Sequence, residues 1–452
     1  MSADSPADLS LAQAALEIAE GRLSSAELVD SCLRAIDARE DEVGAFAFLD
    51  REHALRQAEA ADAHRRAGKT LGALHGLPIG IKDIFDTADM PTEFGSPIHA
   101  GRTPRRDAAC VASLRAAGAV ILGKTVTTEF AYFHPGRTRN PHDPQRTPGG
   151  SSSGSAAAVA ARMVPGAIGS QTNGSVIRPA AFCGVVGFKP SHGLIPRSGA
   201  LLLSRALDHV GVFARTVEDA ALLAEAMAGH HESDPDTHPR ARPPLAATAR
   251  LKPPLPPRFA FVRTAVWEQT ETATRQAFEA LIARLGDSIE EIDMDLSTSA
   301  IHELHATIMQ VEMAENLRQE YERAREKLSA PLLEIIELGR TRLAVDYRRA
   351  LDLADPLRAA ISTVFDEFDA IVTPAAPGEA PRGLDSTGSP AFCTIWTYLG
   401  LPAITLPLLQ GSDGLPIGVQ LVGRLGDDAR LLRTAQSLAA QLSARGGKGR
   451  KR

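Results

Sequence analysis

The chain has 452 residues, of which 44 % are hydrophobic and 23 % charged, and these ordinary globular values exclude wholesale disorder. Its formal charge of −6, from 49 basic and 55 acidic residues, argues against an extended basic surface, so we expect no nucleic-acid partner. Neither a secretory signal nor an apolar run near the roughly 18 residues of a membrane span is evident, which predicts a cytoplasmic protein without membrane contact.

The cysteines support the same compartment. Cys32, Cys110, Cys183 and Cys393 lie far apart and form no CxxC pair. This spacing disfavours a zinc knuckle or a disulfide scaffold and fits a reducing environment.

In chain order, helices and buried strands alternate. Residues of about 8–70 show helical periodicity, and the apolar runs at 77–83 and 119–122 are typical of strands buried on both faces. A helix of small residues at 156–161 is expected to lie centrally, because small side chains permit close packing. Further strands are expected at 184–188, 259–262, 370–373, 403–407 and 419–422, and further helices at 300–365. The alternation predicts an α/β fold.

Two segments depart from this pattern. Residues 231–257 contain eight prolines and are expected to form an extended surface excursion. At its start His230, His231, Asp234, Asp236 and His238 superficially suggest a metal site, but the segment offers no rigid ligand spacing. Residues 446–452 are basic and glycine-rich, and we expect a disordered tail there.

Two familiar motifs are present but lack their structural context. Residues 118–125 match a P-loop, yet the four residues between its glycines are Ala-Val-Ile-Leu, which predict a core strand rather than a phosphate-binding loop. Residues 150–154 match the GxSxG nucleophile elbow with Ser152 as nucleophile, but a loop precedes them where the elbow requires a strand. Neither motif therefore predicts the chemistry.

A third constellation is more specific. It combines the apolar run ending in Lys82-Asp83 with the glycine- and serine-rich blocks 149–160 and 169–180. Together they resemble the amidase signature family of serine hydrolases, and Gln171 with the following Ser-Val-Ile-Arg-Pro-Ala resembles its malonamidase-like, small-amide members. Further segments that match are 76–83, 123–131, 182–190, 208–211, 369–374, 400–403 and 414–420.

The resemblance implies a fold and a domain organisation. The fold is a mixed central β-sheet sandwiched between helices. Because the motifs spread from about residue 10 to 440, we expect a single amidase domain over 1–445, which contains the excursion 231–257 and is followed by the tail 446–452.

The resemblance also implies a Ser–cis-Ser–Lys triad. Ser175 is then the nucleophile, Ser151 the bridging serine after a cis Gly150–Ser151 peptide bond, and Lys82 the base. A serine hydroxyl needs a neighbouring base, and a neutral lysine can serve if burial lowers its pKa from about 10.4 by several units. The apolar run before Lys82 is consistent with such burial.

By the same resemblance, the oxyanion hole is formed by residues 172–175. Its members are Thr172, Asn173, Gly174 and Ser175. Asn173 departs from the small residue usual in the family, so its side chain is expected to crowd or contact the substrate. Arg178 is either a clamp for a substrate carboxylate or a structural arginine, and the sequence favours neither. Gly150 and Ser152 are further candidates for substrate binding.

The expected activity is hydrolysis of a carboxylic amide C–N bond through an acyl-enzyme on Ser175, with release of ammonia or an amine. We expect a small-molecule amide substrate, no cofactor and no metal, and leave a homodimer open. One alternative is the glutaminase-type A subunit of a tRNA-dependent amidotransferase. Another is a catalytically idle binding or assembly protein on the same fold. The particular amide does not follow from the sequence.

Overall fold

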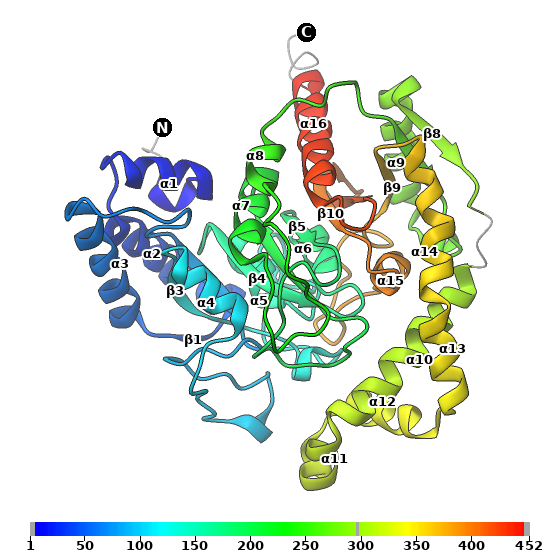
Figure 1. Cartoon of the computed structure of the whole chain (residues 1–452), viewed down its shortest axis with the longest axis horizontal. Coiled ribbons are helices and arrows are strands. Elements are labelled where there is room, and N and C mark those ends of the chain that lie inside the picture. Colours follow the sequence, from blue (N-terminus) through cyan, green and yellow to red (C-terminus); the bar gives the residue numbers. More distant parts are fainter. Residues whose placement is uncertain (1–4, 295–297, 447–452) are drawn as a thin grey trace.

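A mixed β-sheet forms the centre of the molecule (Figure 1). The computed structural model describes residues 5–294 and 298–446, and within them eleven strands join one sheet in the order β1-β3-β2-β4-β6-β5-β10-β11-β9-β7-β8. The strands are β1 (Phe46–Leu49), β2 (Pro78–Lys82), β3 (Val120–Thr125), β4 (Gly166–Gln171), β5 (Val186–Lys189), β6 (His209–Ala214), β7 (Phe259–Val262), β8 (Ile289–Ile292), β9 (Ala370–Pro374), β10 (Ala403–Gln410) and β11 (Pro416–Val422). The predicted α/β class with a mixed sheet is confirmed.

Helices pack around this sheet. They are α1 (Leu11–Ala19), α2 (Ser25–Val43), α3 (Arg51–Arg66), α4 (Ala109–Ala116), α5 (Ser153–Ala160), α6 (Ile177–Cys183), α7 (Val217–Met227), α8 (Leu245–Ala249), α9 (Thr272–Leu285), α10 (Thr298–Asn316), α11 (Arg318–Ala324), α12 (Ala330–Thr341), α13 (Ala344–Asp352), α14 (Ala354–Ser362), α15 (Ala391–Tyr398) and α16 (Asp428–Gly446). In Figure 1, α1–α3 lie on one side of the molecule and α10–α14 on the opposite side. Among the described residues, no helix is both long and apolar enough to cross a bilayer.

Strands β2, β3 and β4 are parallel neighbours, and this arrangement determines where the site lies. Ile81 pairs with Lys124 of β3 on one side and with Ile168 of β4 on the other. Parallel neighbours end at the same edge of a sheet. Lys82 at the end of β2 therefore lies beside Ser170 near the end of β4.

The P-loop-like segment forms strand β3, as its apolar residues predict. Lys124, the lysine of that motif, is fully enclosed and lies 3.3 Å from a carboxylate oxygen of Asp83. It also donates to Thr92 Oγ1 at 2.6 Å and to the Phe85 carbonyl at 2.9 Å. Lys124 is thus bound into the core by an ion pair and backbone contacts.

The small-residue helix α5 lies centrally, as predicted. All its residues from Ser153 to Val159 are buried. Its approach to the neighbouring chain is close, since a Cβ at Gly154 would lie 2.2 Å from the Ala45 carbonyl oxygen and 2.4 Å from the Val126 nitrogen. Only glycine fits between those backbone atoms, and the helix can therefore begin immediately after the loop that carries Ser151 and Ser152.

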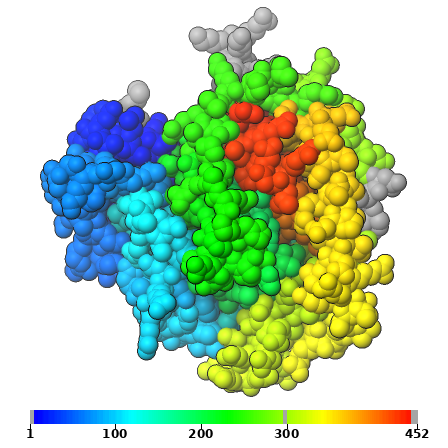
Figure 2. Space-filling model, viewed as in Figure 1, coloured from blue at the N-terminus to red at the C-terminus, as the bar shows by residue number. Residues whose placement is uncertain are grey.

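The proline-rich segment 231–257 differs from the extended excursion that its composition predicts. It contains helix α8, which begins after Pro244 and buries Leu245 and Ala249 against α7 and α16. These two residues are one helical turn apart, so a short apolar face suffices to order the helix. Figure 2 shows the green surface of this part of the chain between the cyan N-terminal and the yellow-to-red C-terminal regions. Residues 447–452 of the predicted tail lie outside the described residues.

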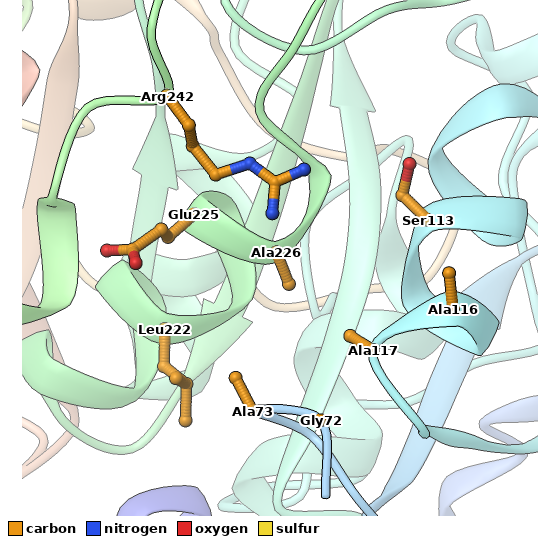
Figure 3. A pocket seen from close by; sticks show the side chains of 9 residues that line it. All are labelled: Gly72, Ala73, Ser113, Ala116, Ala117, Leu222, Glu225, Ala226 and Arg242. Atoms are coloured by element: carbon orange, nitrogen blue, oxygen red, sulfur yellow. The ribbon is translucent and has the colours of Figure 1, made fainter. Parts of the chain in front are cut away.

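A surface cleft of about 330 Å³ lies between α4, α7 and residues 72–73 (Figure 3). Its charged lining groups serve the backbone nearby. Glu225 accepts the Ala246 N–H at 2.7 Å, and Arg242 Nε donates to the Ala228 carbonyl at 3.0 Å. Glu225 and Arg242 therefore hold the start of α8 and the end of α7 in place. None of the predicted site residues lines the cleft.

Candidate active site

Lys82 is the most enclosed charged group of the site. Its side chain is fully buried, and its Nζ donates to Ser151 Oγ at 2.7 Å and to Ser170 Oγ at 2.9 Å. Burial lowers the pKa of Lys82 well below the ordinary 10.5, the negative charge of Asp208 opposes that shift, and the positive charge of Arg178 adds to it. Burial therefore makes the neutral amine easier to form here than on an exposed lysine.

Ser151 follows a cis peptide bond from Gly150, as the family resemblance implies. Its carbonyl accepts the Thr128 N–H at 3.2 Å. The Gly150 carbonyl accepts from Arg178 Nη2 at 2.6 Å and from Arg178 Nε at 3.3 Å. Both carbonyls of the pair are thus held by other segments, so that the Ser151 hydroxyl faces Lys82.

Ser175 lies at the turn between β4 and α6 and lines a small cavity. The cavity is small: the centre of a water molecule can move within only about 20 Å³ of it. Its walls are Ala131, Tyr132, Phe133, Thr172, Asn173, Ser175, Arg178, Leu203 and Met309. The structure therefore brings three predicted oxyanion-hole residues and Arg178 to one pocket, which has room for a small group only.

Gln171 organises the loop that carries Ser175. Its Oε1 accepts the N–H groups of Val176 and Ile177 at 2.8 and 3.0 Å, and its Nε2 donates to Thr397 Oγ1 at 2.9 Å. Thr397 in turn donates to the Asn173 carbonyl at 2.6 Å. An amide both accepts and donates, whereas the aspartate more familiar at this position in the family only accepts, and this chain uses both capacities.

The Asn173 side chain is anchored by α15. Its Oδ1 accepts from Thr394 Oγ1 at 2.8 Å. The residue lines the cavity, but this contact holds its side-chain oxygen toward the helix. Helix α15 thus accommodates the Asn173 side chain, which is larger than the small residue usual in the family.

Arg178 is buried and uses its guanidinium on backbone carbonyls. Besides Gly150, it donates to the carbonyl of Gly388, and the guanidinium carbon lies 5.5 Å from the centre of the Phe133 ring. Burial lowers its pKa to about 10. Both interpretations of Arg178 fit this placement: its contacts are structural, and its positive charge lines the cavity.

Ser152 forms hydrogen bonds with the backbone of Ser170. Its hydroxyl is fully buried, donates to the Ser170 carbonyl at 3.2 Å and accepts the Ser170 N–H at 3.3 Å. These contacts tie the start of α5 to β4. A substrate contact by Ser152 or by Gly150 stays a prediction.

Three residues that the sequence motifs did not indicate as site residues also reach the site. Ser170 accepts from Lys82, Asp208 accepts the Thr172 hydroxyl at 2.6 Å, and His305 donates from Nε2 to the Thr172 carbonyl at 2.9 Å. Ser170 and Asp208 lie within the segments that carry the family resemblance, which was the available signal. His305 comes from α10, far along the chain, and no sequence signal indicated that it would reach the site.

Comparison with known proteins shows the family of the chain. The chain belongs to the amidase family, which it matches over residues 27–432. It is similar to the A subunit of the glutamyl-tRNA(Gln) amidotransferase of Chloroflexus aggregans, with 36 % identity over 470 residues and 95 % of each chain covered. The protein is therefore an enzyme of the class that acts on amide C–N bonds.

Two solved structures share the fold. The peptide amidase of Stenotrophomonas maltophilia superimposes with a TM-score of 0.83 at 29 % identity, covering 96 % of this chain and 97 % of the other. A chain from a vestigial protein complex, described as revealing the evolutionary origins of an s-triazine catabolic enzyme, gives a TM-score of 0.89 at 29 % identity, with 96 % and 98 % covered.

The expectation that nucleic acid has no part is contradicted by the amidotransferase relatives, whose name describes one subunit of an enzyme of glutamyl-tRNA(Gln). The physical reason for the error is that net charge describes one chain alone. In an assembly, a partner protein can supply the basic surface that this chain of charge −6 lacks.

We predict that Gln171→Glu destabilises the protein by about 1–3 kcal/mol, because the carboxylate cannot donate to Thr397 and a buried polar group loses its partner. Urea unfolding measures the change. Thr397→Val breaks the same bridge, so the double variant should be little less stable than the Thr397→Val single variant. An unchanged free energy of unfolding in Gln171→Glu would show that the hydrogen bond from Gln171 to Thr397 does not stabilise the protein.

Proposed function

We propose that the chain hydrolyses a carboxylic amide through an acyl-enzyme on Ser175, with Ser151 as proton relay and Lys82 as base. The observation that carries this proposal is the 2.7 Å contact between the buried Lys82 amine and the hydroxyl of Ser151, which follows a cis peptide bond. The four cysteines are buried free thiols, and we place the protein in the cytoplasm.

The proposed proton path depends on the neutral state of Lys82. A neutral Lys82 keeps a lone pair that can accept the Ser151 proton while the amine still donates to Ser170. Ser151 then takes the proton of Ser175 as Oγ of Ser175 bonds the amide carbonyl carbon. Collapse of the intermediate breaks the C–N bond, and the proton returns through Ser151 to the leaving nitrogen.

The second half of the reaction uses the same groups. A water attacks the acyl carbonyl and gives one proton to Ser151, whose own proton passes to Lys82. When the intermediate collapses, the C–O bond to Ser175 breaks, a proton returns through Ser151 to Ser175 Oγ, and the carboxylic acid is released. In both halves the carbonyl oxygen becomes negative, and backbone N–H groups of the 172–175 loop stabilise it. Gln171, Thr397 and His305 hold that loop, so its donors are oriented before the substrate binds.

The cavity favours a small acyl group. Its free space is small, and Leu203, Met309 and Phe133 are among its walls. A positive charge lines it at Arg178, so an acyl group with a carboxylate is the favoured type. Equal turnover of carboxylate-bearing and neutral small amides would argue that Arg178 is structural only.

We predict a graded loss in four variants. Ser175→Ala lowers kcat by about 10⁴-fold or more, and Lys82→Ala and Ser151→Ala are severely impaired because the relay is broken. Ser170→Ala leaves Lys82 with its Ser151 contact and lowers kcat only about 10-fold, as expected for one hydrogen bond. Turnover is measured on a panel of small amides, aryl amides and amino-acid amides, and near-normal hydrolysis by Ser175→Ala would refute the acyl-enzyme.

The pKa of Lys82 predicts the pH dependence of kcat/KM. The neutral amine is the active form, so activity rises with pH through that pKa and is constant above it. Because burial holds the pKa well below 10.5, the plateau begins far below that pH. Protonation of Asp208, whose pKa burial raises to about 6, adds to the change on the acid side. A profile that still climbs near pH 10 would contradict a buried neutral lysine.

The glutaminase-type A subunit of a tRNA-dependent amidotransferase is the second candidate, and the sequence comparison favours it over a free-standing amidase. The observation behind it is 35–36 % identity to such subunits over 95–96 % of both chains. The acyl chemistry on Ser175 is shared by both roles, so the catalytic variants do not separate them. An idle binding protein is not favoured, because the family and these relatives are enzymes.

Glutamine turnover separates the two roles. For the amidotransferase role, we expect stable co-purification of partner proteins and ammonia release from glutamine that rises when those partners and glutamyl-tRNA are present. An isolated chain that turns over a small amide with kcat/KM above about 10⁴ M⁻¹s⁻¹, with no response to added partners, would instead identify a free-standing amidase.

A further inference from the structure

Asp208 lies behind the predicted oxyanion loop and joins two walls of the site. One carboxylate oxygen accepts the Thr172 hydroxyl at 2.6 Å, and the other accepts the N–H groups of Leu203 and Ser204 at 2.8 and 3.1 Å. Thr172 belongs to the oxyanion loop and Leu203 is a wall of the cavity. A shift of Asp208 would therefore move both features together.

The position of Asp208 follows from the sheet. Strands β4 and β6 are antiparallel, and Gln171 at the end of β4 pairs with His209 at the start of β6. The residue before β6 thus lies opposite the residue after β4, which places Asp208 beside Thr172. Both residues are buried, so these two segments are best joined by directed hydrogen bonds.

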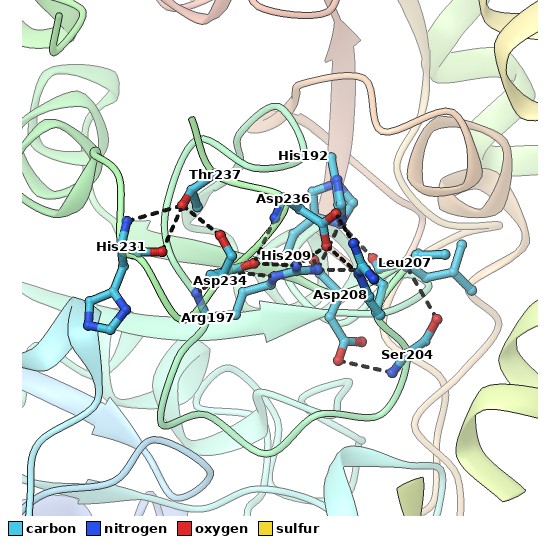
Figure 4. Close-up of polar contacts among 12 residues, drawn as sticks. His192, Arg197, Ser204, Leu207, Asp208, His209, His231, Asp234, Asp236 and Thr237 are labelled. Carbon is cyan, nitrogen blue, oxygen red and sulfur yellow. Dashed lines mark hydrogen bonds and ion pairs between the residues drawn. The ribbon is translucent and has the colours of Figure 1, made fainter. Parts of the chain in front are cut away.

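Arg197 connects Asp208 to a distant segment (Figure 4). Its Nη1 donates to the Asp208 carbonyl at 3.2 Å and to the Arg205 carbonyl at 2.6 Å. On the other side, Nε and Nη2 donate to the two carboxylate oxygens of Asp234 at 3.0 and 2.8 Å, and Nη2 reaches Asp236 at 2.5 Å. One planar guanidinium therefore joins the backbone of Asp208 to two aspartates.

The two aspartates belong to residues 231–237, here named the strap, at the start of the proline-rich segment. Thr237 closes the strap on itself: its hydroxyl donates to the Asp234 carbonyl at 2.9 Å and accepts the His231 N–H at 3.1 Å. Arg197 hydrogen bonds and charge lower the pKa of Asp234 to about 2, although burial opposes them, so this pair is ionised at neutral pH. Side-chain exposure of Arg197 and Asp234 is only 7 % and 4 %, which limits screening by salt.

We propose that the strap sets the geometry of the oxyanion loop, with Arg197 and Asp208 as positioning residues between Asp234, Asp236 and Thr172. This inference rests on the proposed acyl chemistry at Ser175. It gives the proline-rich segment a part in the reaction: the strap anchors Arg197, Arg197 holds the backbone of Asp208, and the Asp208 carboxylate holds the loop whose N–H groups face the developing oxyanion. Misplacement of such donors by a fraction of an ångström slows the chemical step.

The test compares three variants with the intact chain. Arg197→Lys keeps the charge but cannot span Asp234, Asp236 and the Asp208 carbonyl with one ammonium. Asp236→Asn alters the strap at its more exposed aspartate, and so keeps the test open if Arg197→Lys does not fold. Arg115→Lys is the matched control, because Arg115 also bridges two aspartates, Asp107 at 3.0 Å and Asp89 at 2.6 Å, and contacts no proposed site residue.

A fluorophosphonate probe supplies two readouts. Ser175 Oγ bonds the phosphorus as fluoride leaves and the serine proton passes to the base, so the final extent of labelling counts folded sites. The rate of labelling reports the oxyanion donors. We expect Arg197→Lys to be labelled completely, at a rate lowered about 10-fold. Its kcat, divided by the number of sites that labelling counts, should fall to a similar extent, with a smaller change in KM. Asp236→Asn should lose less of both rates.

The outcomes separate this inference from the proposed function. Failure of the intact chain to be labelled on Ser175 would refute the proposed function itself. If the intact chain is labelled, and Arg197→Lys or Asp236→Asn is labelled at the same rate with the same kcat per site, the strap has no positioning role. Equal slowing in Arg115→Lys would also overturn the inference, because it would show a general effect of lost arginine bridges.

Discussion

The site depends on one constraint, which is that Lys82 is buried and, among the described residues, makes no direct ion pair, so that only the more distant charge of Asp208 favours its protonated form. Its hydrogen bonds within the described chain go to the hydroxyls of Ser151 and Ser170. Lys124, on the neighbouring strand, is equally enclosed but lies 3.3 Å from Asp83, and its pKa falls only to about 8. Two lysines of similar burial thus differ in their surroundings, because Lys124 has a direct carboxylate partner and Lys82 has only hydroxyl partners. A lysine without that partner is the one suited to act as a neutral base.

The sheet and the loops have separate tasks in building the site. Hydrogen bonds between the parallel strands β2 and β4 bring Lys82 and Ser170 to one edge, although 88 residues separate them. The loop that carries Ser175 instead depends on side chains, with Gln171 and Thr397 on one side and Asp208 and His305 on the other. Rigid backbone therefore positions the proposed base, and a shell of buried polar contacts positions the proposed nucleophile and the loop of its proposed oxyanion donors.

The sequence allowed a good prediction of seven strands and missed the other four, β1, β4, β6 and β8, while the triad stays a prediction. Unbroken apolar runs predicted β2, β3, β5, β7, β9, β10 and β11 to within a few residues. Strand β4 was missed because Gly166-Ala-Ile-Gly-Ser-Gln171 lacks β-branched continuity, and β8 because its inner residues Glu290 and Glu291 are exposed at the sheet's edge. Contacts such as His305 with Thr172 arise from packing of segments 133 residues apart, which no local pattern encodes. The residues of the proposed triad could be named from the sequence because they lie in segments with a family resemblance, whereas the pocket walls are scattered along the chain.

The division between sheet and loops bears on how such proteins diversify. Most cavity walls come from the loops and from α10, whereas the proposed base lies at the end of β2, a strand paired with β4. Substitutions at positions such as Leu203 or Met309 alter the shape of the acyl pocket and leave the paired strands in place. Descendants of one ancestral chain can therefore acquire new substrates, or a new partner, while inheriting an unaltered base and relay.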